Sequence, residues 1–204
     1  MFNMYEYEDK TYEHALEKCL KDLNVTENDL FIKTREKEGK LFQSKKIVLT
    51  VLLKEEVKKY IKEFIQTIAS NMNITVELEV REEDGIFNVM MMSDSNSILI
   101  GKDGRTLNAI QLLLRQSLQI NTDFQIKVNL DAGNYKAKKV KNFEYEMKKI
   151  MYEVENSKVD ASLDPMNSYE RRIIHNLANQ FSHIKTESYG EGKERHVVVK
   201  YEEE

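Results

Sequence analysis

The most distinctive spacing in the chain is Gly101-Lys102-Asp103-Gly104, a four-residue turn with glycine at both ends. A short apolar segment, residues 97–100, precedes the turn, and a predicted helix begins at Arg105. Glycine has no Cβ, so another backbone can approach this turn closely. We expect the amides that open the Arg105 helix to point outward with partial positive charge, which suits a phosphate group. The sequence therefore predicts a site for the sugar-phosphate strand of a nucleic acid at residues 101–105.

A nucleotide-hydrolase interpretation of the same turn fails on its spacing. The phosphate-binding pattern G-x-x-x-x-G-K-[ST] would need glycine where Asn96 stands and a hydroxyl residue where Asp103 stands. The four histidines, at positions 14, 175, 183 and 196, form no metal-ligand spacing, and no nucleophile-base pair is evident. We therefore predict no enzymatic activity, no metal and no cofactor.

A second set of polar residues lies near the C-terminus. Arg171, His175 and Asn179 are four apart in a helix predicted from Ser168, so they share one outward face. Such a pair of arginine and histidine is more often a surface accident or a cap. A strand containing Lys185, a glycine-bearing loop and a strand led by Arg195 follow, and this order favours a functional interpretation. Asn167 and Glu170 have the spacing of a capping pair at the helix start.

Lysines cluster at the start of a long helix predicted over residues 134–156. They are Lys136, Lys138, Lys139 and Lys141, beside Tyr135, and they form the most basic patch in the sequence. Two interpretations remain open: a solvated helix face, and a contact with RNA.

Composition limits the function classes. The chain has 204 residues, 41% of them hydrophobic, which is enough for packed cores in two or three small domains. We predict a cytoplasmic protein, because no apolar run approaches the roughly 20 residues of a membrane span and the N-terminus lacks a signal-peptide pattern. The net charge is −4, and residues 55–131 carry 8 basic and 12 acidic side chains, so nucleic-acid binding would be local and modest.

Residues 1–54 predict a strand, a helix and two strands. The helix, residues 11–23, is capped by Thr11 and places Cys19 on its apolar face, where packing is a better interpretation than reactivity. The loop 37–46 carries Leu41 and Phe42 between lysines. It is interpreted either as a solvated hairpin with one packed aromatic ring or as a docking point for a partner.

Residues 55–131 predict helix, strand, strand, helix, glycine turn, helix and strand. The first helix, 55–72, is strongly amphipathic, and Asn73 is a plausible left-handed stop. Two strands, 74–80 and 86–92, flank an Asp84-Gly85 turn, and a third covers 124–130. The Arg105 helix has two apolar sides. It is interpreted either as buried on both sides within one chain or as pairing through Ala109, Leu112 and Leu113 with a like domain.

This order of elements, with the sequence Ile100-Gly101-Lys102-Asp103-Gly104, resembles the type II K-homology (KH) domain and its GxxG loop. Residues 165–175, Pro-Met-Asn-Ser-Tyr-Glu-Arg-Arg-Ile-Ile-His, resemble the Arg-xxx-His domain of single-stranded nucleic-acid-binding proteins. With the front module, the whole chain is similar to the Jag family, the SpoIIIJ-associated proteins also called KhpB or EloR. The family usually has a Lys-Lys-Gly-Phe-Leu-Gly-like loop where this chain has residues 39–44.

The resemblance implies an α+β protein of three small modules. They are an N-terminal β-α-β-β module (1–54), a type II KH domain of order α-β-β-α-α-β (55–131) and a C-terminal Arg-xxx-His α/β domain (132–204).

It also implies a cytoplasmic single-stranded RNA-binding protein, an RNA chaperone or post-transcriptional regulator linked to cell elongation and envelope growth. Single-stranded DNA stays open as a ligand. The implied partners are a second copy or a small KH protein bound through the KH domain, and envelope machinery without membrane insertion. The competing hypothesis is a protein-interaction adaptor. The expected RNA contacts are Gly101, Lys102, Asp103, Gly104, Arg105, Arg171, His175, Lys185 and Arg195, with Lys136, Lys138 and Lys139 as further candidates.

Overall fold

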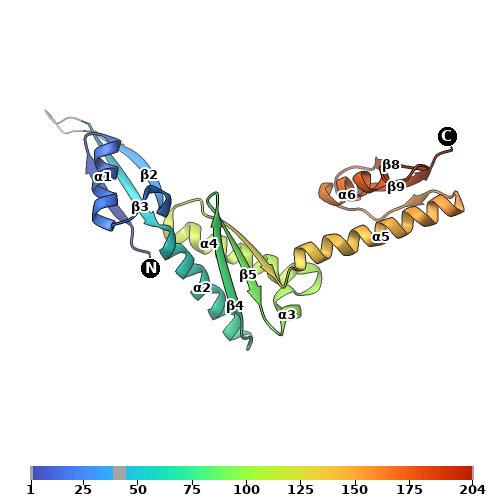
Figure 1. The fold of residues 1–204 in the computed structure, drawn as a ribbon, viewed down its shortest axis with the longest axis horizontal. Coiled ribbons are helices and arrows are strands. Elements are labelled where there is room, and N and C mark those ends of the chain that lie inside the picture. The colour runs from blue at the N-terminus through green and yellow to red at the C-terminus, as the bar shows by residue number, and fades with distance from the viewer. Residues whose placement is uncertain (1, 39–44, 204) are drawn as a thin grey trace. The chain divides into compact units, whose positions relative to one another are not determined.

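The computed structural model describes residues 2–38 and 45–203. The chain divides into two compact units, residues 1–134 and 135–204, and its described residues form three separate three-stranded sheets (Figure 1). This mixed arrangement confirms the predicted α+β class. In the described ranges, no helix is both long enough and apolar enough to cross a bilayer. The hypothesis for Leu41 and Phe42 falls outside the described residues, and the domain boundaries at 54/55 and 131/132 stay predictions.

The first sheet has the order β1-β3-β2, and all its strands are antiparallel. Helix α1 packs on it through Ala15 and Cys19, which are fully buried, so the predicted core role of Cys19 is confirmed. Thr11 caps the helix as predicted, because its Oγ1 accepts the amide of His14 at 3.3 Å. The elements are β1 (Tyr5–Asp9), α1 (Tyr12–Leu23), a 3-10 turn (Glu27–Asp29), β2 (Leu30–Lys37) and β3 (Lys46–Leu53).

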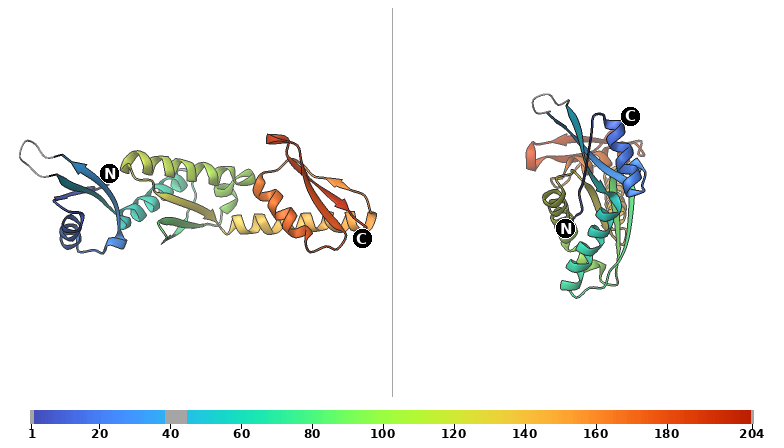
Figure 2. Two further views of the ribbon diagram at one scale, coloured as in Figure 1. Left: turned by 90° about the horizontal axis from the view of Figure 1, so that it is seen from above. Right: turned by 90° about the vertical axis from the view of Figure 1, so that its left-hand side faces the viewer.

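The second sheet has the order β4-β5-β6, with β4 antiparallel and β6 parallel to the central strand. Helices α2 and α4 lie on the same side of it (Figure 2). The predicted turn at Asp84 and Gly85 connects β4 and β5, and both of its residues have positive φ. The elements are α2 (Lys54–Asn71), β4 (Glu77–Glu83), β5 (Ile86–Met92), α3 (Asn96–Ile100), a 3-10 turn (Lys102–Gly104), α4 (Arg105–Thr122) and β6 (Lys127–Ala132).

This succession is the predicted α-β-β-α-α-β order, but two strands begin later than predicted. β4 begins at Glu77 rather than at 74, because the amide of Ile74 still bonds the helical carbonyl of Ala69 at 2.9 Å. β6 begins at Lys127 rather than at 124, because the amide of Ile126 bonds the carbonyl of Phe124 at 3.0 Å in a local turn. Just before each of these two strands, an apolar residue is therefore buried without forming the hydrogen bonds of the sheet.

The outer edge of β6 is covered by side chains of α4. The Arg115 guanidinium donates to the carbonyl of Val128 at 2.6 and 2.9 Å, and Gln111 Oε1 accepts the amide of Leu130 at 2.8 Å. Edge strands expose unpaired backbone groups that invite pairing with other chains. These contacts satisfy two of them and fix α4 along the strand.

Helix α4 buries only one of its two apolar sides. On the other side, Leu112 and Leu113 are 57% and 53% exposed, and Ile120, which the sequence analysis did not single out, is 81% exposed. The interpretation that both sides are buried within one chain is therefore wrong for the described structure. The buried side consists of Leu107, Ile110, Leu114 and Leu118.

The front module contacts the KH-like elements within the first unit. The Phe31 ring of β2 lies 6.0 Å from the Phe87 ring and 6.1 Å from the Phe124 ring, measured between centroids. Lys54 Nζ, at the start of α2, lies 2.9 Å from Glu82 Oε1, and both side chains are largely shielded from solvent. Because β3 runs directly into α2, the two modules share a continuous backbone at this contact.

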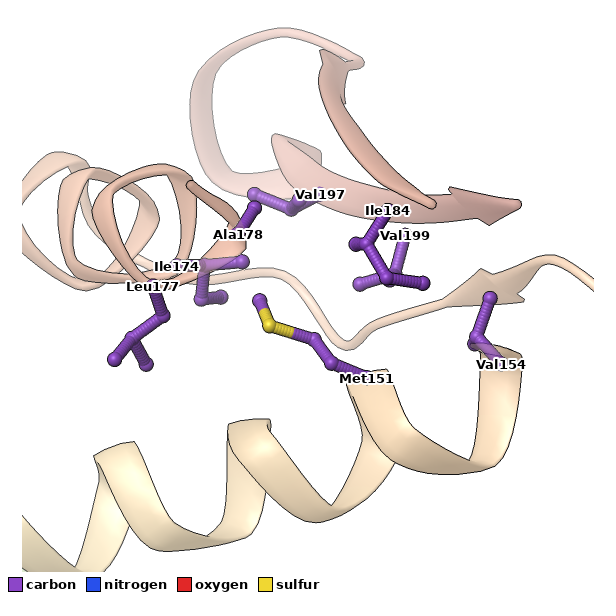
Figure 3. Packing of buried hydrophobic residues seen from close by; sticks show 8 residues of the cluster. All are labelled: Met151, Val154, Ile174, Leu177, Ala178, Ile184, Val197 and Val199. Carbon is purple, nitrogen blue, oxygen red and sulfur yellow. The ribbon is translucent and has the colours of Figure 1, made fainter. Parts of the chain in front are cut away.

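The C-terminal unit has its own sheet, of order β7-β9-β8, with α5 and α6 packed on one face. Met151 and Val154 of α5 point towards Ile174 of α6 and Val199 of β9 (Figure 3). The short strand β7 has no counterpart in the sequence prediction. The elements are α5 (Tyr135–Ser157), β7 (Ala161–Ser162), α6 (Ser168–Ala178), β8 (Ile184–Tyr189), a 3-10 turn (Gly192–Glu194) and β9 (His196–Tyr201).

The Lys54–Glu82 contact makes a testable prediction about pH. The hydrogen bond from Lys54 lowers the pKa of Glu82 below its ordinary value, and the amide of Gly85 adds to the effect. A lowered folded-state pKa gives stability above the ordinary pKa of glutamate and loses it as the pH falls through the folded value. We expect urea unfolding of the first unit to lose stability below about pH 4.5, and Glu82→Gln to remove part of this loss.

The matched control is Glu83→Gln, on the same strand but exposed. It should keep the wild-type pH profile. Superimposable profiles for Glu82→Gln and wild type would show that the contact does not contribute in solution.

Candidate nucleic-acid interface

The glycine turn lies between α3 and α4, as predicted. Its backbone is unusual: φ is +68° at Gly101, +55° at Asp103 and +84° at Gly104. The amide of Gly104 donates to the carbonyl of Gly101 at 3.3 Å, and the amide of Arg105 donates to the carbonyl of Lys102. The first amide of α4 therefore points into the turn, which corrects the expectation that the opening amides all point outward.

Gly101 is required by a close approach within the turn. With φ +68° and ψ −178°, its backbone lies in a region that essentially only glycine adopts. A Cβ added there would lie 2.1 Å from Thr106 Oγ1 and 3.1 Å from the Thr106 amide nitrogen. The side chain of Thr106 thus fills the space that a side chain at 101 would need, and the turn is fixed against the first residues of α4.

The outer surface of the turn carries charged side chains. Lys102, Asp103 and Arg105 are exposed, whereas Gly104 is buried. Ile98, one turn before Gly101 in α3, is 52% exposed. Ile98 was not predicted from the sequence as a site residue; the adjacent Leu99 is fully buried and lies on the inner side of the same short helix. The turn therefore presents two cations, one carboxylate and an apolar side chain.

The second candidate site begins with a well-defined helix start. Asn167 Oδ1 accepts the amides of Tyr169 and Glu170 at 2.9 and 3.0 Å, and Glu170 Oε2 accepts the amide of Asn167 at 3.1 Å. This is the predicted capping pair. It fixes the first turn of α6, so that Arg171 and His175 lie one turn apart on the helix.

His175 does not point freely outward. Its Nδ1 lies 2.8 Å from Thr186 Oγ1 and its Nε2 lies 3.1 Å from Ser188 Oγ, both on β8. The expectation of one outward stripe is therefore wrong in part: the imidazole is half-buried against the sheet, whereas Asn179, the C-cap of α6, is exposed. Sequence analysis missed Thr186 and Ser188, although their i, i+2 spacing places two hydroxyl groups on one face of the strand.

Arg171 and Arg195 are positioned differently from each other. Arg171 is half-buried, and its Nε is buried with no hydrogen-bond partner among the described residues. Arg195 is exposed at the start of β9, and its carbonyl accepts the amide of Met166 at 3.1 Å, just before α6. This backbone contact holds the Arg195 end of β9 against the segment that leads into α6.

Lys185 lies on the opposite face of β8 from Thr186 and Ser188, because successive side chains of a strand alternate between faces. Its Nζ pairs with Glu202 Oε1 at 3.0 Å, and this bond raises the pKa of Lys185 above its ordinary value. The structure therefore does not bring Lys185 together with His175.

The lysine cluster lies on the first two turns of α5, where Lys136, Lys138, Lys139 and Lys141 are all exposed. Beside it is a shallow groove of about 600 Å³ between α5 and the first turn of α6. Its lining residues are Lys136, Ala137, Val140, Lys141, Glu144 and Tyr169.

Comparison with known families covers both candidate sites. A family model described as "KhpA/KhpB, KH domain" matches residues 58–130, and the model of the Arg-xxx-His domain matches residues 141–201. A Clostridium symbiosum protein named RNA-binding protein KhpB is 34% identical over 200 residues, which is 96% of this chain and 90% of that protein. The chain belongs to the KhpB family. The KhpB relative from Bacillus subtilis is 28% identical and covers 94% of this chain and 95% of its own length.

The KhpB relationship confirms the resemblance stated from the GxxG loop and the Arg-xxx-His sequence. A further KhpB, from Lactiplantibacillus plantarum, is 29% identical over 67% of this chain but only 42% of its own length.

The close approach at Gly101 can be tested by substitution. Gly101→Ala strains the backbone and also makes the new Cβ clash with Thr106. Gly85→Ala strains the backbone at a similar φ of +74°, but no atom lies within 4 Å of its new Cβ. We expect Gly101→Ala to destabilise the first unit by at least about 1 kcal/mol more than Gly85→Ala does. Amide hydrogen exchange across α3 and α4 measures the difference. Equal exchange in both variants would contradict the role of Thr106.

Proposed function

We propose that this protein binds single-stranded RNA through the Gly101–Gly104 turn. The observation that carries the proposal is a glycine-bounded turn between α3 and α4, with Lys102 and Arg105 exposed, inside a KhpB-type KH domain. KH domains clamp about four nucleotides with such a loop. The two cations attract the phosphates, and Ile98 offers an apolar surface to a base.

The charge of the turn limits what it can do alone. Asp103 is exposed beside Lys102, and the surrounding segment has more acidic than basic residues. A strand would be positioned weakly here. A second contact on the same chain raises the overall affinity, because linked sites bind their ligand at high effective concentration.

The second contact is the Arg171 and His175 region of the C-terminal unit. Arg195 lies at the exposed start of β9, and Lys136, Lys138 and Lys139 lie on α5. Arg171, whose Nε lacks a partner among the described side chains, would gain a phosphate or base acceptor on binding. Lys185 can contact RNA only if its ion pair with Glu202 breaks, so we assign it a smaller part of the RNA affinity.

The names of the relatives support the RNA-binding part of the cellular role. Curated relatives from Clostridium symbiosum and Bacillus subtilis carry the name RNA-binding protein KhpB. We propose a cytoplasmic RNA chaperone or post-transcriptional regulator, with a link to cell elongation and envelope growth.

Protein pairing is the other part of the proposal. The outer face of α4, formed by Ala109, Leu112, Leu113 and Ile120, is apolar and exposed in the chain. Exposed apolar patches of this kind mark interaction surfaces. We propose that α4 pairs with a KH domain, either in a second copy or in a small KH protein. The same face supports the alternative function of an adaptor for protein partners.

RNA binding by the turn is tested with Lys102→Asp. We expect at least threefold weaker binding to single-stranded RNA. The slope of log affinity against log salt concentration should also become shallower by about one. A filter-binding series from low to high salt measures both. The matched control is Lys62→Asp, an exposed lysine on α2 in the same unit. Equal affinity and slope for Lys102→Asp and wild type would remove the turn from the RNA site.

Pairing through α4 is tested with Leu112→Glu and Leu113→Glu, each of which puts a charge on the apolar face. Wild type at tens of micromolar is sedimented by itself and mixed with a small KH protein. It should form species heavier than the 24.0 kDa monomer in at least one of these conditions, and the variants should sediment as monomers. Asn108→Glu, also exposed on α4, is the control. A wild type that is monomeric under both conditions would contradict the proposal.

A further inference from the structure

Helix α5 has a second organised face, opposite the one that packs in the core. The core side carries Met151 and Val154, which pack on the sheet and α6 (Figure 3), and Met147, which packs against the same cluster. On the other side, lysine and tyrosine recur every three or four residues, so they line up along the helix. We call this the outer face of α5; it consists of Lys138, Lys141, Tyr145, Lys149 and Tyr152, all exposed.

The lysines of the outer face are available to a ligand. Among the described residues, no carboxylate lies at ion-pair distance from Lys138, Lys141 or Lys149. Three other lysines of this unit differ, because a carboxylate neutralises each of them. Lys158 pairs with Glu203 at 2.9 Å, Lys185 with Glu202 at 3.0 Å and Lys200 with Glu187 at 2.6 Å.

The acidic residues of α5 do not interrupt the outer face. A helix turns about 100° per residue, which places Glu146 and Glu153 on one flank and Glu144 and Glu155 on the other. The face is therefore a strip of positive charge in a chain whose net charge is −4. Its complement is a linear polyanion.

The aromatic residues give the face a second chemistry. Tyr145 is 73% exposed and Tyr152 is 57% exposed, two helical turns or about 10.5 Å apart. The Tyr152 ring contacts the Phe181 ring edge-on at a centroid distance of 4.9 Å, which restricts its orientation. Exposed aromatic rings beside cations are the combination on which single-stranded nucleic acids stack their bases.

The outer face adjoins the groove between α5 and α6 at Lys141. The groove is lined by the apolar side chains of Ala137 and Val140 and by Tyr169, which is 60% exposed. Lys141 belongs to both surfaces, and Glu144 also lines the groove. A strand that leaves the groove can therefore continue past Lys141 along the outer face of the helix.

We propose that the outer face of α5 and the Tyr169 groove, which include Lys136 and Lys138, form a track for single-stranded RNA made of residues other than the Gly101–Gly104 turn, Arg171 and His175. The proposal rests on the RNA-binding function proposed above and assigns Lys141, Tyr145, Lys149 and Tyr169 to it. Phosphates bind the lysines, and bases stack on Tyr145 and Tyr169. A protein ligand would favour an unbroken apolar strip like that of α4, which this face lacks.

The test measures the affinity of the full-length protein for a fluorescent oligouridylate of about 12 nucleotides over a range of salt concentrations. Lys141→Gln/Lys149→Gln should lower the salt slope by about 1.4, since each phosphate contact on a single strand contributes about 0.7. Tyr145→Leu should weaken binding at least about fivefold. Tyr145→Phe, which keeps the ring, should bind like wild type.

The control is Lys21→Gln/Lys62→Gln, which removes the same charge from exposed helix positions in the other unit. Its salt slope should stay within experimental error of wild type. The Lys102→Asp variant is measured beside it to separate the two hypotheses. One outcome separates the two proposals: wild type binds RNA, Lys102→Asp binds more weakly, and Lys141→Gln/Lys149→Gln and Tyr145→Leu both bind like wild type. In that case the track is wrong and the proposed function stands.

If wild type does not bind the oligouridylate or other single strands, both proposals fail. If Tyr145→Leu and Tyr145→Phe lose affinity equally, stacking is wrong. If the lysine variant instead loses binding to a protein partner and keeps its affinity for RNA, the face belongs to that partner and the track is again overturned.

Discussion

Each sheet formed by the described residues has three strands, and helices that bury one of its faces stabilise so small a sheet. That constraint determines the orientation of every long helix. Helix α4 must turn Leu107, Ile110, Leu114 and Leu118 to its sheet, and α5 must turn Met151 and Val154 to the other. The remaining faces of both helices are left to solvent or to partners. The side chains on those outer faces are therefore not needed for the core and are available for binding.

The two outer faces have opposite chemistry. The outer face of α4 is apolar, with Leu112, Leu113 and Ile120 exposed, whereas that of α5 alternates lysine with tyrosine. Apolar burial favours another protein surface, and cations beside aromatic rings favour a single-stranded nucleic acid. The same packing constraint thus leaves one helix face for the proposed protein pairing and the other for the proposed RNA contact.

Ion pairs within the C-terminal unit further limit which of its cations can contact RNA. Lys200 donates to Glu187 and to Tyr189, and this network lowers the pKa of Glu187 and raises that of Lys200. Positive charge on the open face of the β8-β9 sheet is consequently neutralised within the protein. The number of basic residues in a segment is therefore a poor guide to its RNA contacts, because only cations without carboxylate partners contribute counterion release at low cost.

The sequence by itself determined the order of elements apart from β7, the glycine turn, the caps at Thr11 and Asn167 and the family. These are local features: apolar periodicity, residues that need positive φ, and side chains that bond amides two or three positions away. It could not decide that His175 bonds Thr186 and Ser188, that Lys185 pairs with Glu202 or that Leu112 stays exposed. Those outcomes depend on which element packs on which face. Only the tertiary structure fixes that choice, because it brings together residues 11 to 17 positions apart and leaves some apolar side chains exposed.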